Sequence, residues 1–151
     1  MINIFVTVGT TPFDSLIQQL DVLAKDCPQF NITAQVSNFS NYEVKNFSSF
    51  QFSSDIDDYI CNSQLVITHA GAGSVYRLLE LEKTVLVVPN VERIDKHQIE
   101  IANFVESQNY ASVCYDIDKL KEAIDKALLT TSSVYRKVDF FGETMILGEL
   151  I

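Results

Sequence analysis

Two short runs of this chain carry residues of the types and spacing that bind an anion. Residues 69–74 read His-Ala-Gly-Ala-Gly-Ser, and residues 9–11 read Gly-Thr-Thr. Glycine lets an anion approach the backbone closely, and hydroxyl and backbone N–H groups donate hydrogen bonds to its oxygens. The chemistry that both runs could support is therefore recognition of a phosphate or a diphosphate.

The residues around positions 69–74 predict a strand-to-helix turn. Residues 65–68, Leu-Val-Ile-Thr, are apolar and β-branched and predict a buried strand, and apolar residues then recur at helical spacing over 75–81. A helix N-terminus has unpaired N–H groups and a partial positive charge, so the turn predicts a phosphate cradle. Ser74 is placed to cap the helix or to bond the ligand. The alternative is a plain tight turn in which Ser74 is an ordinary N-cap.

Two common nucleotide-binding motifs are excluded. Position 76 is Tyr, so Gly71 and Gly73 do not begin the Gly-x-Gly-x-x-Gly fingerprint of dinucleotide-binding proteins. No Gly-Lys-Ser/Thr follows, so the run is not a Walker A loop. A nucleotide sensor or oxidoreductase of the Rossmann type therefore lacks its sequence signature here.

Two other predicted strands end in polar loops. Residues 2–8 predict a strand that ends at Gly9, and residues 84–88 predict a strand followed by a loop that contains Asn90. Open α/β sheets bind ligands in the loops at the carboxyl ends of their strands. We therefore expect both loops to lie near the ligand of the glycine-rich run, although a plain turn capped by threonine would also explain residues 9–11.

The two histidines and one glutamine are the remaining candidates for the site. His69 ends the predicted strand before the glycine-rich run, and His97 and Gln98 follow the loop after residues 84–88. His69 could hold its loop or donate to a phosphate oxygen. The amide of Gln98 can bond sugar hydroxyls both as donor and as acceptor.

The alternation of predicted strands and helices indicates an α/β fold, a single Rossmann-like, doubly wound and mostly parallel sheet. The last predicted strand covers residues 111–115 and the last predicted helix covers residues 116–129, and we expect residues 1–130 to form one nucleotide-binding domain. Residues 131–151 are more apolar than a free tail, and we expect a C-terminal helical segment that packs on the domain or, as the favoured alternative, on a partner chain. An exposed docking face would also allow a homodimer when the chain is alone.

Composition excludes several classes of function. The net charge of −9 argues against nucleic acid as a partner and against direct attraction to anionic lipid. The three cysteines are odd in number and widely spaced, which is typical of reduced thiols in a cytoplasmic protein. We find no secretory signal and no apolar run of about 20 residues, so we expect any membrane association to come through a partner or an amphipathic surface.

Three motifs in order resemble family 28 glycosyltransferases. They are the His-Ala-Gly-Ala-Gly-Ser run, the Asp-Lys-His-Gln sequence of residues 95–98, and the Phe-Val-Thr-Val-Gly-Thr-Thr-Pro-Phe-Asp sequence of residues 5–14. The chain is similar to the catalytic subunits of eukaryotic dolichol-linked UDP-GlcNAc transferases, and closer to the PssE-type subunits of bacterial capsule and exopolysaccharide assembly. The resemblance covers residues 1–124 and implies the C-terminal, donor-binding half of a GT-B architecture.

The resemblance implies inverting transfer of a hexose from a UDP-sugar to a polyprenyl-diphosphate-linked saccharide, without a cofactor or metal. It also implies a membrane-associated, acceptor-binding partner of the PssD type, which would supply the base, with His69 as a further catalytic candidate. The expected donor-binding residues are Gly9, Thr10, Thr11, His69, Ala70, Gly71, Ala72, Gly73, Ser74, Arg77, Glu80, Asn90, His97 and Gln98.

One position departs from the family pattern. A Glu that bonds the nucleotide ribose commonly stands three residues beyond the Ser, and this chain has Arg77 there. Arg77 could pair with a donor phosphate or a uronate sugar, or be a surface residue. Glu80, one turn on, could bond the ribose or pair with Arg77. This departure favours a second hypothesis, a non-catalytic accessory subunit that stabilises or activates a partner glycosyltransferase.

Overall fold

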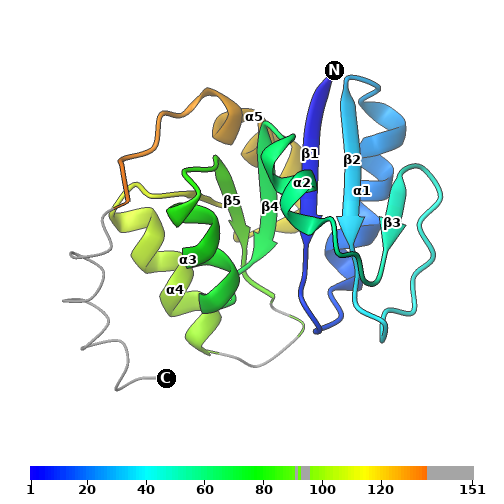
Figure 1. Cartoon of the computed structure of the whole chain (residues 1–151), viewed down its shortest axis with the longest axis horizontal. Helices are drawn as coiled ribbons and strands as arrows, with labels where there is room; N and C mark the ends of the chain where they lie inside the picture. The colour runs from blue at the N-terminus through cyan, green and yellow to red at the C-terminus, as the bar shows by residue number, and fades with distance from the viewer. Residues whose placement is uncertain (91, 93–95, 136–151) are drawn as a thin grey trace.

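The fold is built on one parallel sheet of six strands (Figure 1). The computed structural model describes residues 1–90, 92 and 96–135. Every pair of neighbouring strands is parallel, and the spatial order is β3-β2-β1-β4-β5-β6. The strands are β1 (Ile2–Thr7), β2 (Phe30–Gln35), β3 (Ser48–Phe50), β4 (Leu65–His69), β5 (Val85–Val88) and β6 (Ser112–Val113).

Helices cover both faces of the sheet, as the doubly wound prediction required. One hydrophobic cluster joins the sheet to α1 and α5, and a second joins the opposite face to α2, α3 and α4. The helices are α1 (Asp14–Asp26), α2 (Ile56–Cys61), α3 (Ala72–Glu80), α4 (Lys96–Ser107) and α5 (Leu120–Leu129), with a 3-10 turn, η1 (Ile117–Lys119), before α5. No helix among the described residues is long and apolar enough to cross a bilayer.

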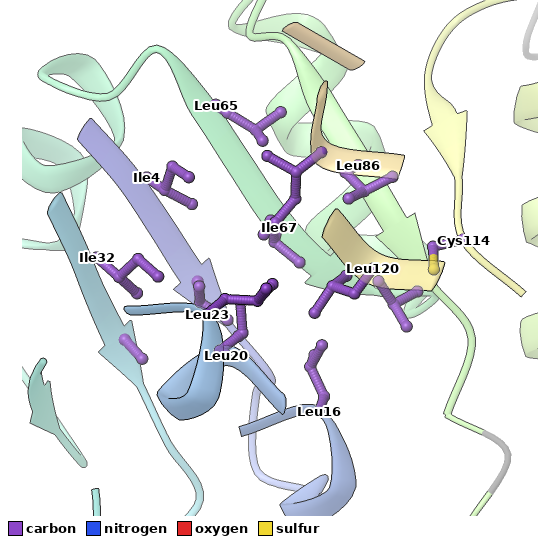
Figure 2. Close-up of a cluster of buried hydrophobic side chains, with 14 of the residues drawn as sticks. Ile4, Leu16, Leu20, Leu23, Ile32, Leu65, Ile67, Leu86, Cys114 and Leu120 are labelled. Atoms are coloured by element: carbon purple, nitrogen blue, oxygen red, sulfur yellow. The ribbon is translucent and has the colours of Figure 1, made fainter. Parts of the chain in front are cut away.

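The apolar pattern of the strands explains this layering. Residues 65–68 and 85–88 are buried throughout, because helices pack on both faces of β4 and β5. Figure 2 shows the cluster beneath α1 and α5, in which Ile4, Ile67 and Leu86 of the sheet meet Leu16 and Leu120 of the two helices.

The prediction of a doubly wound, parallel sheet is confirmed, and two boundaries of its elements are corrected. The strand predicted over 111–115 shortens to β6, two residues long. The helix predicted over 116–129 begins instead with η1, because the side chain of Asp116 accepts a hydrogen bond from the N–H of Asp118 and caps that turn.

The described end of the chain packs on the domain. The backbone N–H of Ser133 donates to the carbonyl of Asn109 at 2.8 Å. The Tyr135 ring lies 6.3 Å from that of Tyr76 and 5.3 Å from that of Tyr110, measured between centroids. The rest of the predicted helical segment, residues 136–151, lies outside the described residues, so the division at residue 130 stays a prediction.

Two carboxylates of α1 hold the long loop between β2 and β3. Asp21 is buried, and it accepts hydrogen bonds from the Tyr42 hydroxyl at 2.5 Å and from the backbone N–H of Asn46 at 2.7 Å. Asp14, two turns earlier, accepts from the backbone N–H of Asn41 at 3.0 Å. Burial alone raises the pKa of Asp21, but the hydrogen bonds from Tyr42, Asn46 and Lys45 outweigh it and lower the pKa below its ordinary 3.8.

We expect Asp21→Ala to lower the free energy of unfolding by about 3 kcal/mol at neutral pH, because it removes the shared acceptor of the Tyr42 hydroxyl and of the Lys45 and Asn46 backbone N–H groups. Since the folded state lowers the pKa of Asp21, its charge stabilises the fold above pH 3.8, and this stabilisation is lost as the pH falls through the folded-state pKa.

Urea denaturation of wild type and variant should therefore show a difference that shrinks between about pH 7 and about pH 3. Asp26→Ala, at the exposed end of the same helix, is the matched control and should change stability little at either pH. A difference between wild type and Asp21→Ala that does not vary with pH would contradict this account.

Candidate functional site

The candidate site lies where the sheet changes its winding direction. The chain leaves β1 toward β2 on one side, and β4 toward β5 on the other, so the loops after β1 and β4 diverge at the carboxyl edge of the sheet. The strands end together at this edge (Figure 1), because Thr7 pairs with Thr68, and His69 pairs with Val88. Such a switch point is the usual ligand-binding crevice of an open α/β sheet.

The His69 imidazole lies between the glycines of the two loops. A Cβ atom added to Gly9 would lie 3.1 Å from Nε2 of His69, and one added to Gly71 would overlap Cε1 of the same ring. Gly9 also has φ at 65°, in the left-handed region that favours glycine. Both glycine-containing loops therefore lie against His69, and it stays a prediction that they share one ligand site.

The surroundings of His69 favour its neutral form. Burial lowers the pKa of His69 below its ordinary 6.5, because the charged imidazolium is poorly solvated there. Nδ1 of the ring is buried and has no hydrogen-bond partner in the described part of the chain. The residue therefore separates the two loops by its shape, and it can donate to or accept from a ligand without adding a charge.

Helix α3 points its N-terminus at this edge, but its cap differs from the prediction. The helix begins at Ala72, so Gly71 is the N-cap and Ser74 lies inside the first turn, with no side-chain cap hydrogen bond. Among the described residues, the backbone N–H groups of Ala72, Gly73 and Ser74 have no acceptor. A Cβ on Gly73 would meet nothing within 4 Å. The protein's own packing therefore does not require glycine at position 73, whereas close approach by a ligand would.

Two polar residues that the sequence did not single out hold the loop after β1. Gln35, at the end of β2, bonds both the N–H and the carbonyl of Gly9, and Ser37 donates to the carbonyl of Thr10 at 2.8 Å. Both side chains are buried. The pairing of β1 with β2 brings them beside this loop, and a single sequence carried no signal for that long-range register.

The loop after β5 is tied to the same edge by Asn90. Its backbone N–H donates to Oε1 of Gln98 at 2.8 Å, and its Nδ2 donates to the carbonyl of Pro12 at 3.0 Å. Glu92 accepts from the backbone N–H of Ser15 at 2.9 Å, in the first turn of α1. Asn90 and Gln98 are both buried, so each has a structural part in positioning the loops in addition to the predicted donor contact.

The remaining predicted residues lie at the margin of the site or on the surface. His97 is half-buried, and its Nδ1 lies 3.4 Å from a carboxylate oxygen of Glu100. Arg77 is exposed and forms an ion pair with Asp57 of α2. Glu80 is exposed at the last position of α3. The structure therefore brings together residues 9–11, 69–74, Asn90 and Gln98. The side chain of Arg77 instead joins α3 to α2 through its ion pair.

No group of three or more His, Cys, Asp or Glu side chains in the described ranges is arranged to hold a metal.

Comparison with known proteins identifies the family. The sequence profile of the glycosyltransferase family 28 C-terminal domain matches residues 3–139. The chain belongs to this family. The UDP-N-acetylglucosamine transferase subunit ALG13 of Candida albicans is 37% identical to this family 28 chain over 87 residues, which are 58% of the chain and 29% of that protein. The chain thus matches less than a third of that relative's length.

Solved structures agree on the fold. An NMR solution structure of ALG13 superposes with a TM-score of 0.63 at 20% identity, covering 95% of this chain and 94% of that one. MurG of Acinetobacter baumannii superposes with a TM-score of 0.64 at 19% identity, covering 84% of this chain but 43% of MurG. At these identities the likeness concerns the fold alone. This family 28 domain has the Rossmann-like fold of one half of a GT-B glycosyltransferase.

The two glycines of the turn should respond oppositely to alanine. We expect Gly71→Ala to lower the free energy of unfolding by about 1–3 kcal/mol, because its methyl group would overlap the His69 ring. Gly73→Ala should leave it unchanged or raise it by up to about 1 kcal/mol, because position 73 is open and alanine favours a helix. Urea denaturation of the pair checks this, and an equal loss in both variants would contradict the geometry.

The His69 imidazole should titrate below its ordinary pKa of 6.5 in the folded protein. Because the unfolded state binds the proton first, stability contributed by neutral His69 should fall as the pH drops below 6.5 toward the folded-state pKa. NMR of the imidazole Cε1–H, folded and in urea, measures both midpoints. A folded midpoint equal to the midpoint in urea would disprove the burial of this ring.

Proposed function

We propose that this chain is the donor-binding subunit of a two-chain inverting glycosyltransferase. It would bind a UDP-sugar, and the hexose would pass to a polyprenyl-diphosphate-linked saccharide of capsule, exopolysaccharide or O-antigen synthesis. The observation that carries the proposal is the meeting of residues 9–11 with the N-terminus of α3 around His69. This arrangement offers backbone N–H groups and little steric bulk, which suits a nucleotide diphosphate.

The chemistry proposed for this chain is stabilisation of the leaving group. When the acceptor hydroxyl attacks the anomeric carbon, the bond from that carbon to the diphosphate oxygen breaks and negative charge develops on UDP. Fixed N–H dipoles at the start of α3, at Ala72, Gly73 and Ser74, would stabilise this charge. Thr10 and Thr11 would add hydroxyl and N–H donors from the loop after β1. A neutral His69 could donate to a phosphate oxygen.

The sugar and nucleoside contacts are proposed for the loop after β5 and for the outer part of α3. Asn90, His97 and Gln98 lie on the side where a hexose would extend from the diphosphate. Glu80 is exposed at the end of α3, where it could bond the ribose. Because Arg77 is paired with Asp57, a role for Arg77 at a donor phosphate would require that ion pair to open.

The acceptor and the base are proposed to belong to a second chain, a membrane-associated subunit of the PssD type. Support comes from the Candida albicans relative, whose name describes a transferase subunit. We place the pair at the cytoplasmic face of the membrane, where a lipid-linked acceptor would be reached. The proton of the acceptor hydroxyl would pass to the base on the partner.

A second candidate function is a non-catalytic accessory subunit, which would stabilise a partner that carries its own donor site. The observation that favours it is Arg77, which replaces the Glu of the family pattern and pairs with Asp57 on the surface. The two functions differ in whether this chain, alone or in the pair, binds UDP.

Calorimetric titration with UDP, on the chain alone and on the co-expressed pair, tests the proposal. Wild type should bind saturably in at least one form. Gly73→Ala and Gly73→Asp should bind at least about tenfold more weakly, because each blocks approach to the start of α3 and Asp also repels the diphosphate. Gln108→Asp adds the same charge just beyond the far end of α4 and should bind like wild type. Absence of binding in both forms would favour the accessory function.

A further inference from the structure

The side chain of Gln35 is the most fully engaged polar group at the carboxyl edge. Its Oε1 accepts from the Thr7 hydroxyl at 2.8 Å and from the backbone N–H of Gly9 at 3.1 Å. Its Nε2 donates to the carbonyls of Gly9 and Val36, each at 3.0 Å, and lies 3.4 Å from that of Gln51. Both lone pairs and both hydrogens of the amide are therefore used, in a side chain that is 8% exposed.

Beyond the last backbone pair of β1 and β2, the hydrogen bonds between the two segments come from the Gln35 side chain. Regular register ends with Thr7 opposite Gln35, and the N–H of Val8 reaches the Gln35 carbonyl at 3.4 Å. Gly9 has a φ of 65°, outside the range of an extended strand, and the regular ladder has ended before it. The Gln35 side chain bonds both the N–H and the carbonyl of Gly9, as a peptide group of a neighbouring strand would do.

We propose that Gln35 is a positioning residue for donor binding, acting through Gly9 on the loop that faces the diphosphate. The inference rests on the proposed function and names a residue outside the predicted site. By fixing both polar groups of Gly9, Gln35 holds this loop against the His69 ring, and so fixes its distance from the start of α3. A site arranged before the ligand arrives loses less conformational freedom on binding.

The residues of the loop after β1 have different roles in the proposed site. The N–H of Gly9 is occupied by Gln35, so Gly9 serves the site by its conformation and its missing side chain. The N–H groups of Thr10 and Thr11 donate to no acceptor in the described part of the chain. These two groups, with the exposed Thr10 hydroxyl, are the donors that the loop would present to a diphosphate.

Packing alone does not explain a carboxamide at this position. A buried amide loses its hydration, and this cost is offset only because all of its bonds are made within the protein. Three of those bonds go to Thr7 and Gly9, the last strand residue and the glycine of the loop. The amide is therefore placed to determine the loop conformation, and the nearby Ser37–Thr10 hydrogen bond fixes the next residue in the same way.

The test compares Gln35→Met, which has a similar volume and no amide, with Asn31→Ala. Asn31 lies on the same strand and the same face, about 13 Å away along β2, and loses its own side-chain hydrogen bond to Asn3. Exchange of the Gly9 amide hydrogen, followed by NMR in the full chain without ligand, reports the contact directly. UDP titration of the chain and of the co-expressed pair reports its effect on the site.

Gln35→Met should speed Gly9 exchange and weaken UDP binding, each by about tenfold or more, since two hydrogen bonds to the loop are lost. Asn31→Ala should leave both within about twofold of wild type, even where its melting temperature falls equally. Thr7→Val, which removes one support of the Gln35 amide, should weaken binding less than Gln35→Met and add nothing in that background.

Unchanged Gly9 exchange in Gln35→Met would overturn the contact itself. Faster exchange with unaltered UDP affinity, or equal weakening by Asn31→Ala, would overturn the role in positioning. Failure of every wild-type form to bind UDP would instead contradict the proposed function, and with it any role of Gln35 in donor binding. The exchange measurement needs no ligand and still decides whether Gln35 holds the loop, so the two failures can be told apart.

Discussion

The candidate site depends on the absence of side chains on the two sides of one imidazole ring. A Cβ atom at position 71 would overlap the His69 ring, and one at position 9 would lie 3.1 Å from it, at a φ of 65° that favours glycine, so glycine at both places suits the close approach of the loops after β1 and β4. The strands fix the ends of these loops, because Thr7 and Thr68 are paired in register. The separation of the two loops at the switch point is therefore set by a steric contact at the end of paired strands.

The proposed anion site lies in a protein that carries a net charge of −9. The groups that would attract the anion lie close to the site. The helix dipole of α3 and unbonded N–H groups act over short distances, and the neutral His69 adds no charge. Two carboxylates near this edge accept hydrogen bonds from the backbone. Glu92 accepts from the N–H of Ser15 in the first turn of α1, and Asp14 accepts from the N–H of Asn41 in the loop between β2 and β3. Glu92 accepts from a backbone N–H at the start of α1, and Asp14 is the first residue of that helix, so both negative charges lie where the helix dipole favours them.

The sequence was sufficient to predict the elements and their layering, and insufficient to predict how the loops are held. Apolar runs and helical spacing are local signals, so the sheet, the helices and the strand-to-helix turn at His69 were all foreseen. Ser74 was expected to cap the helix or to bond the ligand, because hydroxyl caps are common, but the cap is Gly71, three residues earlier. Gln35 was missed because its importance comes from the pairing of β1 with β2, and Gln98 was assigned only a ligand although its Oε1 binds the backbone of Asn90.

The two edges of the sheet are short. At one edge stands β3, with three residues, and at the other β6, with two. Such brief edges offer few free backbone groups, so a second chain cannot add a strand and extend the sheet over any useful length. Association through the described part of the chain must therefore use helix faces and loops, which rely on side-chain complementarity. An interface of that kind can change its partner by surface substitutions while the sheet stays as it is.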